Sequence, residues 1–232
     1  MRKILLASAA LMALSGAAFA ADHNDARARQ EHSTLSIIEQ VQTSDHHKAN
    51  ALQTSQTGSD ILQNQQGRGN SAYAAQTGGG FLAGIDNSAK QFQKGDSNDA
   101  VALQVSTSRG RIVQNQDGNN NKAKAEQVRG AGNTALQTQK GRHNEAYSYQ
   151  GGSLGSSVTQ YQDGNHNFTY AEQLGGASNS ITQTQYRDNN KAFAYQDGGL
   201  GNKIAQFQAG NHNVANASQL GGSFNTIKQT QN

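Results

Sequence analysis

The feature of this sequence that most restricts its fold is an internal repeat. Units that begin at Ile37, Asp60, Ser88, Arg111, Thr134, Ser157, Ser180 and Lys203 align without gaps, at a spacing of 23 residues except for one spacing of 28. The five additional residues fall in the loop TGGGFLAGIDN, residues 77–87. A fixed period of about 20 to 50 residues is typical of solenoids, in which each unit buries its inner face only by stacking on its neighbours.

The same amide side chains recur at the same positions of the 23-residue unit. Glutamine occupies positions 4, 6 and 17 of all eight units, and asparagine occupies position 11 of seven, with His47 in the first. Position 4 holds Gln40, Gln63, Gln91, Gln114, Gln137, Gln160, Gln183 and Gln206. Position 6 holds Gln42, Gln65, Gln93, Gln116, Gln139, Gln162, Gln185 and Gln208; position 11 holds Asn70, Asn98, Asn121, Asn144, Asn167, Asn190 and Asn213; position 17 holds Gln53, Gln76, Gln104, Gln127, Gln150, Gln173, Gln196 and Gln219.

Between the amides the pattern has a period of two. Position 2 is aliphatic, and positions 13 and 15 are alanine except for Thr169 and Ser148. Successive side chains of a strand point to opposite faces, so positions 2, 4 and 6 form one inward row and positions 11, 13, 15 and 17 form another. Glycine at position 8 predicts a turn between the rows, and a glycine-rich segment such as LGGASN predicts a second turn. Each unit is therefore predicted to be strand, turn, strand, turn.

These units predict an all-β fold, a β-solenoid with two facing parallel sheets. At about 4.8 Å per turn, eight units give a rod about 38 Å long. A primary amide has two donors and one acceptor, so identical amides stacked along the rod are expected to satisfy each other in ladders. A disordered glutamine-rich linker is the alternative that the 34% hydrophobic content suggests. Disorder gives no reason to keep one register through eight units, so we favour the solenoid.

The first twenty residues predict secretion. Arg2 and Lys3 precede the apolar run ILLASAALMALSGAAFA, which ends in the small-x-small triplet Ala18-Phe19-Ala20. This pattern is typical of a signal peptide at residues 1–20, with a mature chain that begins near Ala21. Removing Arg2 and Lys3 from the 19 basic residues leaves 17 against 16 acidic ones, a net charge of +1 that does not favour a nucleic-acid partner. The chain has no cysteine, so disulfides do not stabilise it.

The two flanks of the repeat array continue its register as half units. In residues 24–30, Asn24, Ala26, Ala28 and Gln30 fall on positions 11, 13, 15 and 17, within an N-terminal segment of residues 21–36. After the eight repeats of residues 37–225, residues 226–232 place Ile227, Gln229 and Gln231 on positions 2, 4 and 6. We expect these seven residues to form a head-to-tail subunit interface, in which two half units make one composite turn.

The repeat resembles the curlin repeat, in which a glutamine and a glycine-containing turn precede Asn-x-Ala-x-x-x-Gln. The stretches QDGNHNFTYAEQ and QAGNHNVANASQ carry this resemblance, which covers residues 24–232. It implies that positions 6, 11 and 17 are the inner amide ladders. It also implies a structural subunit of curli, the extracellular amyloid fibres of the bacterial surface, which build biofilm matrix and mediate adhesion like a pilus or fimbrium. The implied partners are further copies of the chain, a nucleator, an outer-membrane secretion channel and chaperones.

Three sets of side chains leave alternatives open. His143, His166 and His212 share position 10 and are either weak metal ligands or, as we expect, solvated turn residues, and His46 and His47 are interpreted in the same way. Asp117, Asp163 and Asp188 in the first turn either form a like-charge column that opposes premature assembly or are ordinary turn residues. The outward aromatics serve lateral association or simply favour strands; they are Tyr147, Tyr149, Tyr161, Phe168, Tyr170, Phe193, Tyr195 and Phe207.

No group of residues predicts an enzyme. The sequence has no cysteine nucleophile and no phosphate-binding loop between a strand and a helix, and TGGGFLAG lacks the lysine of such a loop. We therefore expect no catalytic residue, no cofactor and no small-molecule substrate. Three functions stay open: the main fibre subunit, a minor subunit that nucleates the fibre, and a monomeric carbohydrate-binding solenoid. The regular glutamine columns favour the first.

Overall fold

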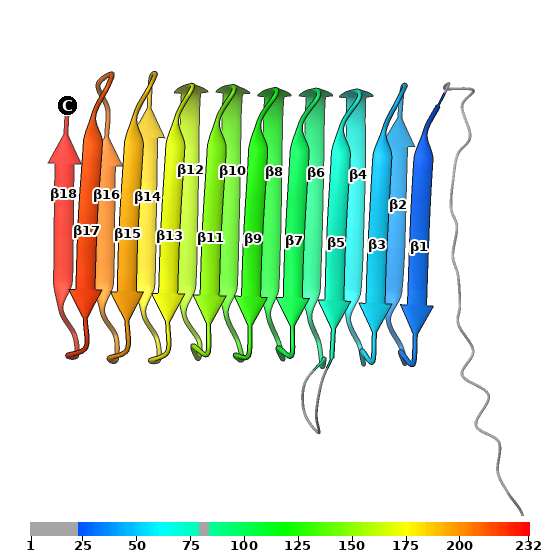
Figure 1. Cartoon of the computed structure of the whole chain (residues 1–232), viewed down its shortest axis with the longest axis horizontal. Helices are drawn as coiled ribbons and strands as arrows, with labels where there is room; N and C mark the ends of the chain where they lie inside the picture. The colour runs from blue at the N-terminus through cyan, green and yellow to red at the C-terminus, as the bar shows by residue number, and fades with distance from the viewer. Residues whose placement is uncertain (1–22, 79–83) are drawn as a thin grey trace, which may run out of the picture.

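The computed structural model describes residues 23–78 and 84–232, and these residues form a β-solenoid of two parallel sheets with nine strands each (Figure 1). The predicted all-β solenoid fold is confirmed. No helix occurs among the described residues, so none is present there that could span a membrane. The predicted signal peptide lies outside the described residues.

The two sheets take alternate strands of the chain. One sheet contains β1 (Asp25–Glu31), β3 (Lys48–Thr54), β5 (Ser71–Thr77), β7 (Asp99–Val105), β9 (Lys122–Val128), β11 (Glu145–Gly151), β13 (Phe168–Leu174), β15 (Lys191–Asp197) and β17 (Val214–Leu220). The other contains β2 (Ile37–Thr43), β4 (Asp60–Arg68), β6 (Ser88–Asp96), β8 (Arg111–Asn119), β10 (Thr134–Arg142), β12 (Ser157–Asn165), β14 (Ser180–Tyr186), β16 (Lys203–Gln208) and β18 (Thr226–Gln231). β1 and β18 lie at opposite ends of the rod (Figure 1).

Each strand pairs with equivalent residues one turn away. In β10 and β12, for example, Ala135 pairs with Val158 and Gln139 with Gln162. The longer spacing between the second and third units does not shift this register, because Thr77 still pairs with Val105. The strands on either side of the insertion therefore keep the pairing of the repeat.

The core is narrow because its apolar side chains are small. Ala51, Ile61, Ala74 and their equivalents along the rod form one buried cluster, and Val158, Ala171 and Ile181 belong to a second. The exceptions Ser148 and Thr169 are buried as well. Alanine at positions 13 and 15 leaves the sheets close enough for glutamine side chains to reach the opposite backbone.

Glycine at position 8 lets adjacent turns stack closely, but it does not end the strand. Gly67, Gly95, Gly118, Gly141 and Gly164 have φ between 101° and 144°, and a Cβ atom on any of them would overlap the carbonyl group at the same position of the next turn. In β4, β6, β8, β10 and β12 the strand continues to position 9. The turn lies at positions 10 and 11 instead of position 8, where the sequence pattern predicted it. At Arg187 φ is 68°, and β14 stops at Tyr186.

The second turn contains a further, one-residue column of parallel bridges. It runs along position 21 from Thr34 through Thr57, Ile85, Ser108, Ala131, Leu154, Ala177 and Leu200 to Ser223. These bridges hold the second corner in the same register as the sheets. Both the long faces and this corner therefore repeat at the same spacing.

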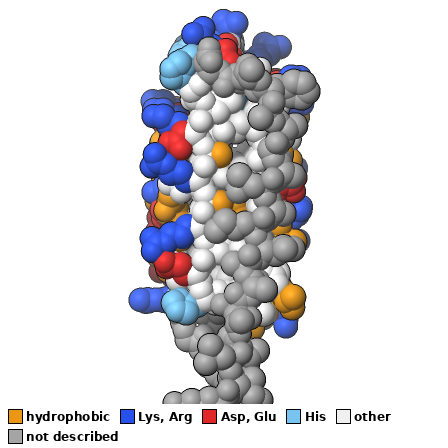
Figure 2. Space-filling model, turned by 90° about the vertical axis from the view of Figure 1, so that its right-hand side faces the viewer, with side chains coloured by type: hydrophobic (Ala, Val, Ile, Leu, Met, Phe, Trp, Pro, Cys, Tyr) orange, Lys and Arg blue, Asp and Glu red, His pale blue; other side chains and the backbone are white. Residues whose placement is uncertain are grey.

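Charges on the outer surface alternate in sign along the rod. Wherever two charged residues meet in the register of the described strands, their signs are opposite; the pairs are Asp25 with Lys48, Arg68 with Asp96, Lys94 with Asp117, Asp117 with Lys140, Lys140 with Asp163, Asp99 with Lys122, and Lys122 with Glu145. Basic and acidic side chains are likewise interspersed on the surface seen from the β1 end (Figure 2).

This alternation contradicts the idea that Asp117 and Asp163 form a like-charge column. Lys140 lies between them, and its pKa is raised chiefly by the neighbouring Tyr161 hydroxyl, with further contributions from Asp163 and Asp117. Asp188 acts as an ordinary turn residue, because its carboxylate accepts the backbone N–H of Asn165 at 2.7 Å. Asp117 and Asp163 thus lie within β8 and β12 and not in the first turn, where the sequence placed them, whereas Asp188 lies in the turn and bonds to the neighbouring one.

Reversing one charge in this column tests the interpretation. Asp117→Lys places three positive side chains on consecutive turns, so the variant should unfold several degrees below the parent chain in a thermal melt. The difference should be large near 10 mM salt, where the Debye length is about 30 Å, and small near 1 M, where it is about 3 Å. Thr138→Lys, whose register neighbours are the uncharged Asn115 and Tyr161, is the matched control. Equal melting of both variants at low salt would contradict the argument.

Candidate functional site

Three glutamine columns run through the interior from one end of the rod to the other. In each column the Nε2 of a glutamine donates to the Oε1 of the glutamine one turn further along the chain, over nine residues and eight hydrogen bonds. At position 4 the column joins Gln40 to Gln229 with distances of 2.7 to 2.9 Å. At position 6 it joins Gln42 to Gln231 with 2.7 to 3.1 Å. At position 17 it joins Gln30 to Gln219 with 2.6 to 3.0 Å.

The position 4 column extends the expected set. The resemblance to curlins assigns ladders to positions 6, 11 and 17, whereas the structure gives position 4 a ladder as complete as that of position 6. Gln63, Gln91, Gln114, Gln137 and Gln183 at this position are fully buried. The period-two pattern of the sequence carried this signal, because it places position 4 on the inner face.

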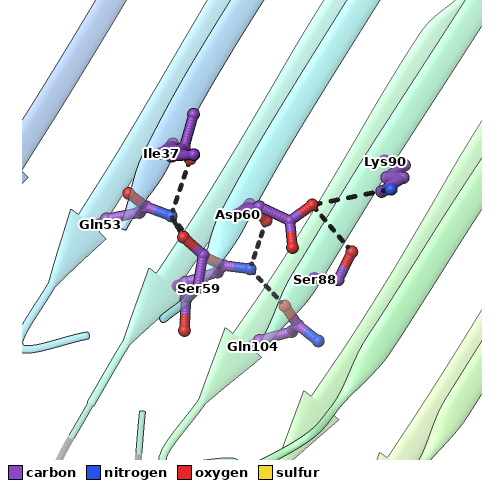
Figure 3. Close-up of polar contacts among 8 residues, drawn as sticks. Ile37, Gln53, Ser59, Asp60, Ser88, Lys90 and Gln104 are labelled. Atoms are coloured by element: carbon purple, nitrogen blue, oxygen red, sulfur yellow. Dashed lines mark hydrogen bonds and ion pairs between the residues drawn. The ribbon is translucent and has the colours of Figure 1, made fainter. Parts of the chain in front are cut away.

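At positions 4 and 6 the second Nε2 hydrogen of every ladder glutamine binds a carbonyl group of the opposite sheet. At position 17 the glutamines Gln53, Gln76, Gln127 and Gln173 do the same. Gln137 and Gln139 of β10 donate to the carbonyl groups of Lys124 and Lys122 in β9, at 2.9 and 2.8 Å. In the position 17 column, Gln53 donates to the carbonyl groups of Ile37 and Ser59 (Figure 3). Gln76 likewise donates to the carbonyl group of Asp60. Both donors of the amide are thereby used, and the carbonyl bond fixes on which side the nitrogen lies. The ladders consequently have a direction, with donors facing the β17–β18 end.

Close to the Gln53 ladder, an outer contact joins the same turns. The carboxylate of Asp60 accepts a hydrogen bond from the Ser88 hydroxyl at 3.1 Å and lies 3.9 Å from the Lys90 ammonium (Figure 3). All three side chains are partly exposed, so the ion pair adds little to stability. The buried amides, not the outer charges, hold consecutive turns together.

The asparagine column at position 11 does not form the expected side-chain ladder. The Oδ1 of each asparagine from Asn70 to Asn190 accepts the backbone N–H of the next asparagine at 2.8 to 3.0 Å. The Nδ2 of Asn70, Asn98, Asn121 and Asn144 donates to the carbonyl group at position 8 of the next turn, at 2.7 to 2.9 Å. The reason is the shorter side chain, which keeps the amide beside backbone groups of the turn that the sheet leaves unpaired.

His47 replaces asparagine in this column and takes over its hydrogen bonds. Its Nδ1 accepts the backbone N–H of Asn70 at 3.2 Å, and its Nε2 lies 3.0 Å from the carbonyl oxygen of Thr43. This arrangement requires the neutral tautomer with the proton on Nε2. His47 is 0% exposed, so its interpretation as a solvated turn residue is wrong. An imidazole with one acceptor and one donor nitrogen is a close substitute for the amide.

A further buried column, at position 23, was missed by the sequence reasoning. Its members are mostly serine or asparagine, namely Ser36, Ser59, Asn87, Asn133, Ser156, Asn179, Asn202 and Asn225. The side-chain oxygen accepts the backbone N–H at position 23 of the next turn, as from Asn87 to Ser59 at 3.0 Å and from Asn202 to Asn179 at 2.9 Å. The recurrence of Ser or Asn directly before every first strand except β8, which follows Gly110, was the signal that could have identified it.

Four of the histidines at position 10 stack in two pairs on the outer edge of the first turn, whereas Asn189 separates His212 from His166. Ring centroids of His143 and His166 lie 4.9 Å apart, and those of His23 and His46 lie 5.0 Å apart. Position 10 residues have left-handed backbone angles, with φ of 55° at His143 and 57° at His166. Among the described residues no three His, Cys, Asp or Glu side chains are close enough to hold a metal ion. The described geometry gives these histidines a turn position and assigns them no ligand.

The outward aromatic side chains form one row on each sheet. Tyr147, Phe168 and Phe193 lie on one face with centroids 5.4 to 5.8 Å apart. Tyr161, Tyr186 and Phe207 lie on the other at 5.7 Å. On the first face, burial raises the pKa of Tyr170 to about 12, helped by its hydrogen bond to Glu172 at 2.8 Å. Each row therefore spans three consecutive turns of its sheet.

The ends of the rod leave ladder groups without partners. The buried Nε2 of Gln219 and Nδ2 of Asn213 have no hydrogen bond, and no described residue donates to the Oε1 of Gln30, Gln40 or Gln42. The remaining expected interface residues Asn24, Ala26, Ala28, Ile227, Gln229 and Gln231 are exposed or partly buried. The structure places Ile227, Gln229 and Gln231 in β18, and Ala26, Ala28 and Gln30 in β1, with Asn24 just before it.

Removing one ladder amide should destabilise the rod far more than removing its outward neighbour. Gln139→Ala leaves the Nε2 of Gln116 without its ladder acceptor and opens a cavity, so unfolding in urea should require about 3 kcal/mol less. Gln139→Met keeps the volume and should lose about 1 to 3 kcal/mol. Thr138→Ala, on the outer face, should change stability by less than about 0.5 kcal/mol. Equal losses for the two positions would contradict the inward assignment.

The position 11 column predicts which residues can replace His47. His47→Asn restores the repeat residue and should leave the free energy of unfolding within about 0.5 kcal/mol of the parent, because the acceptor for Asn70 is kept. His47→Ala leaves that N–H buried and unpaired, and should lose about 1 to 3 kcal/mol. Urea unfolding of the two variants measures the difference. If His47→Asn were as unstable as His47→Ala, the proposed equivalence of imidazole and amide would be wrong.

Comparison of the sequence with models of known protein families and with curated proteins finds no match. The functional argument therefore depends on the residues and the geometry described above.

Proposed function

We propose that this chain is a structural subunit of extracellular curli-type amyloid fibres, and that it polymerises by adding its turns end to end. The observation that carries the proposal is the continuity of the three glutamine ladders, which pass through the nine strands of each sheet and reach both ends with unpaired amide groups. Identical side chains in parallel, in-register strands are the arrangement of cross-β fibres.

The structure of the two ends favours a polymer over a monomeric rod. Repeat proteins that stay monomeric need terminal units with a polar outer face. In the described residues both ends instead expose strand edges with the ladder residues of the interior, and the aliphatic column ends in the half-buried Ile38 and Ile227. Unpaired edges of this kind are templates for the addition of further strands.

Secretion and the remaining partners are proposed on the basis of the sequence. The predicted signal peptide supports export, and the curlin resemblance supports a place on the bacterial surface, with a role in biofilm matrix and adhesion. A nucleator, an outer-membrane secretion channel and chaperones are the partners that this resemblance implies. We propose no catalytic role, no cofactor and no small-molecule substrate.

Two other functions are kept as alternatives. A minor subunit that nucleates the fibre would share this fold, but the last half unit keeps Ile227, Gln229 and Gln231 in register with β16, which favours the main subunit. A monomeric carbohydrate-binding solenoid would use an outer hollow such as the one of about 430 Å³ beside Tyr147, Tyr149 and Tyr170. That function requires a soluble monomer, whereas the first two require assembly.

Refolding of the purified chain of residues 21–232 tests the proposal. On dilution from denaturant, thioflavin fluorescence should rise after a lag, preformed fibres should shorten the lag, and electron microscopy should show unbranched fibres. Fibre diffraction should give a reflection near about 4.8 Å along the axis and one near about 10 Å across it. A chain that stays monomeric and binds an oligosaccharide instead would replace the proposal with the carbohydrate-binding alternative.

A further inference from the structure

The two ends of the rod have complementary shapes, because a different sheet projects at each end. At one end β1 extends its sheet one strand beyond β3, while the opposite sheet stops at β2. At the other end β18 extends the second sheet beyond β16, while the first sheet stops at β17. The rod therefore has a projecting strand at each end, and the two projecting strands belong to different sheets (Figure 1).

We propose that the β17–β18 end of one copy binds the β1–β2 end of a second copy of this chain, and that β18 of the first and β1 of the second together form one composite turn. β18 then pairs with β2 of the next copy, and β1 of that copy pairs with β17. This inference rests on the proposed function, since it specifies the joint by which the subunits polymerise.

The register of this joint is set by the repeat. Continuing the parallel pairing by one turn places Ile227 beside Ile38 of the next copy, Gln229 beside its Gln40, and Gln231 beside its Gln42. In the other sheet the same rule places Ala215, Ala217 and Gln219 beside Ala26, Ala28 and Gln30. Every inward column therefore continues through the joint with its own residue type.

The direction of the glutamine ladders makes the two ends chemically different. The β17–β18 end presents the Nε2 groups of Gln219, Gln229 and Gln231, each without a glutamine acceptor in the described chain. The β1–β2 end presents the Oε1 groups of Gln30, Gln40 and Gln42, each without a donor. Three donors meet three acceptors only when unlike ends join. Gln219 is 8% exposed, so its unpaired amide is a buried group that the joint satisfies.

The outer charges that meet at the joint have opposite signs, as they do within the rod. Lys228 of β18 is placed beside Glu39 of β2 in the next copy, which is another pair of opposite signs. Within its own chain Lys228 pairs with Ala205, and Glu39 pairs with Leu62, so neither charge has a charged register neighbour before assembly. These two residues therefore complement each other specifically across the joint.

Pairing the β1–β2 end of one copy with the β1–β2 end of another is unfavourable. An antiparallel contact between two β1 strands centred on Ala28 places Asp25 opposite Glu31 and Arg27 opposite Arg29 of the second copy. Like charges directly opposite each other destabilise a strand pair. The joint thus favours one polarity, and the heterologous contact gives an open filament.

Charge exchange across the joint tests the proposal in the full chain of residues 21–232. Glu39→Lys alone and Lys228→Glu alone each place like charges at every joint, so elongation from parent seeds should slow about two- to fivefold at low salt. An equal mixture of the two variants has opposite charges at each mixed joint and should elongate close to the parent rate, as should the double variant E39K/K228E on seeds made of that same variant. Single variants that elongate like the parent, or a mixture that stays slow, would overturn the joint.

Cross-linking provides a readout of the register, since the chain has no cysteine of its own. Val41→Cys and Thr230→Cys in one chain place the two thiols on neighbouring strands of adjacent copies, where a disulfide is feasible, and about 38 Å apart within one copy. Mild oxidation of fibres should then give a ladder of covalent oligomers on a non-reducing gel. The matched control Thr43→Cys with Thr230→Cys is displaced by two residues, leaves Glu39 in place and should give much less.

The results separate the joint from the function. If the parent chain forms no fibres, the proposed function itself fails. If the parent forms fibres but the Val41 and Thr230 thiols do not cross-link and charge exchange has no effect, the fibre stands and the composite turn is wrong.

Discussion

The hydrogen bond from one glutamine to the identical glutamine a turn away is the interaction on which the rest of the structure depends. It requires two side chains of the same length at the same height, so it holds only while strands remain parallel and in register. A slip of one residue would turn every inward amide to the surface and bring outward side chains inside. Because the amides at positions 4 and 6 also bind carbonyl groups of the facing sheet, as Gln139 does with Lys122, register and sheet spacing are fixed together.

Small apolar side chains make this interaction possible. A core of leucine or phenylalanine at positions 13 and 15 would separate the sheets and break the bonds from glutamine to the opposite backbone. Alanine keeps the sheets close together, but it buries less apolar surface than a larger side chain would. This is consistent with a hydrophobic content of only 34%. Amides buried without partners would each cost about 1 to 3 kcal/mol, so stability here depends on completing the hydrogen bonds and less on the hydrophobic effect.

The sequence was sufficient to predict the solenoid, the two sheets and the inward rows, because a period of two within a period of 23 specifies which side chains face inward. It was not sufficient to predict which atoms pair. Side-chain length decides that, so Asn98 binds backbone groups while Gln93 binds another glutamine. His47 was misjudged because a histidine among turn residues suggests exposure, and only the column shows that its two nitrogens replace an amide. Of the two interpretations of the Asp117 column, the like-charge one is contradicted because Lys140, from the unit between, separates Asp117 from Asp163.

The tolerance of the corner after β5 has a consequence for how such a rod can vary. Thr77 and Gly84 flank the inserted residues, yet Ile85 keeps its bridges to Thr57 and Ser108, and all three glutamine ladders pass this turn unbroken. Chain length is therefore constrained along the strands and free at this corner. Peptides inserted at the equivalent corners of other turns would be displayed at the spacing of the strands. The rod would then carry a row of inserted peptides whose attachment points are about 4.8 Å apart.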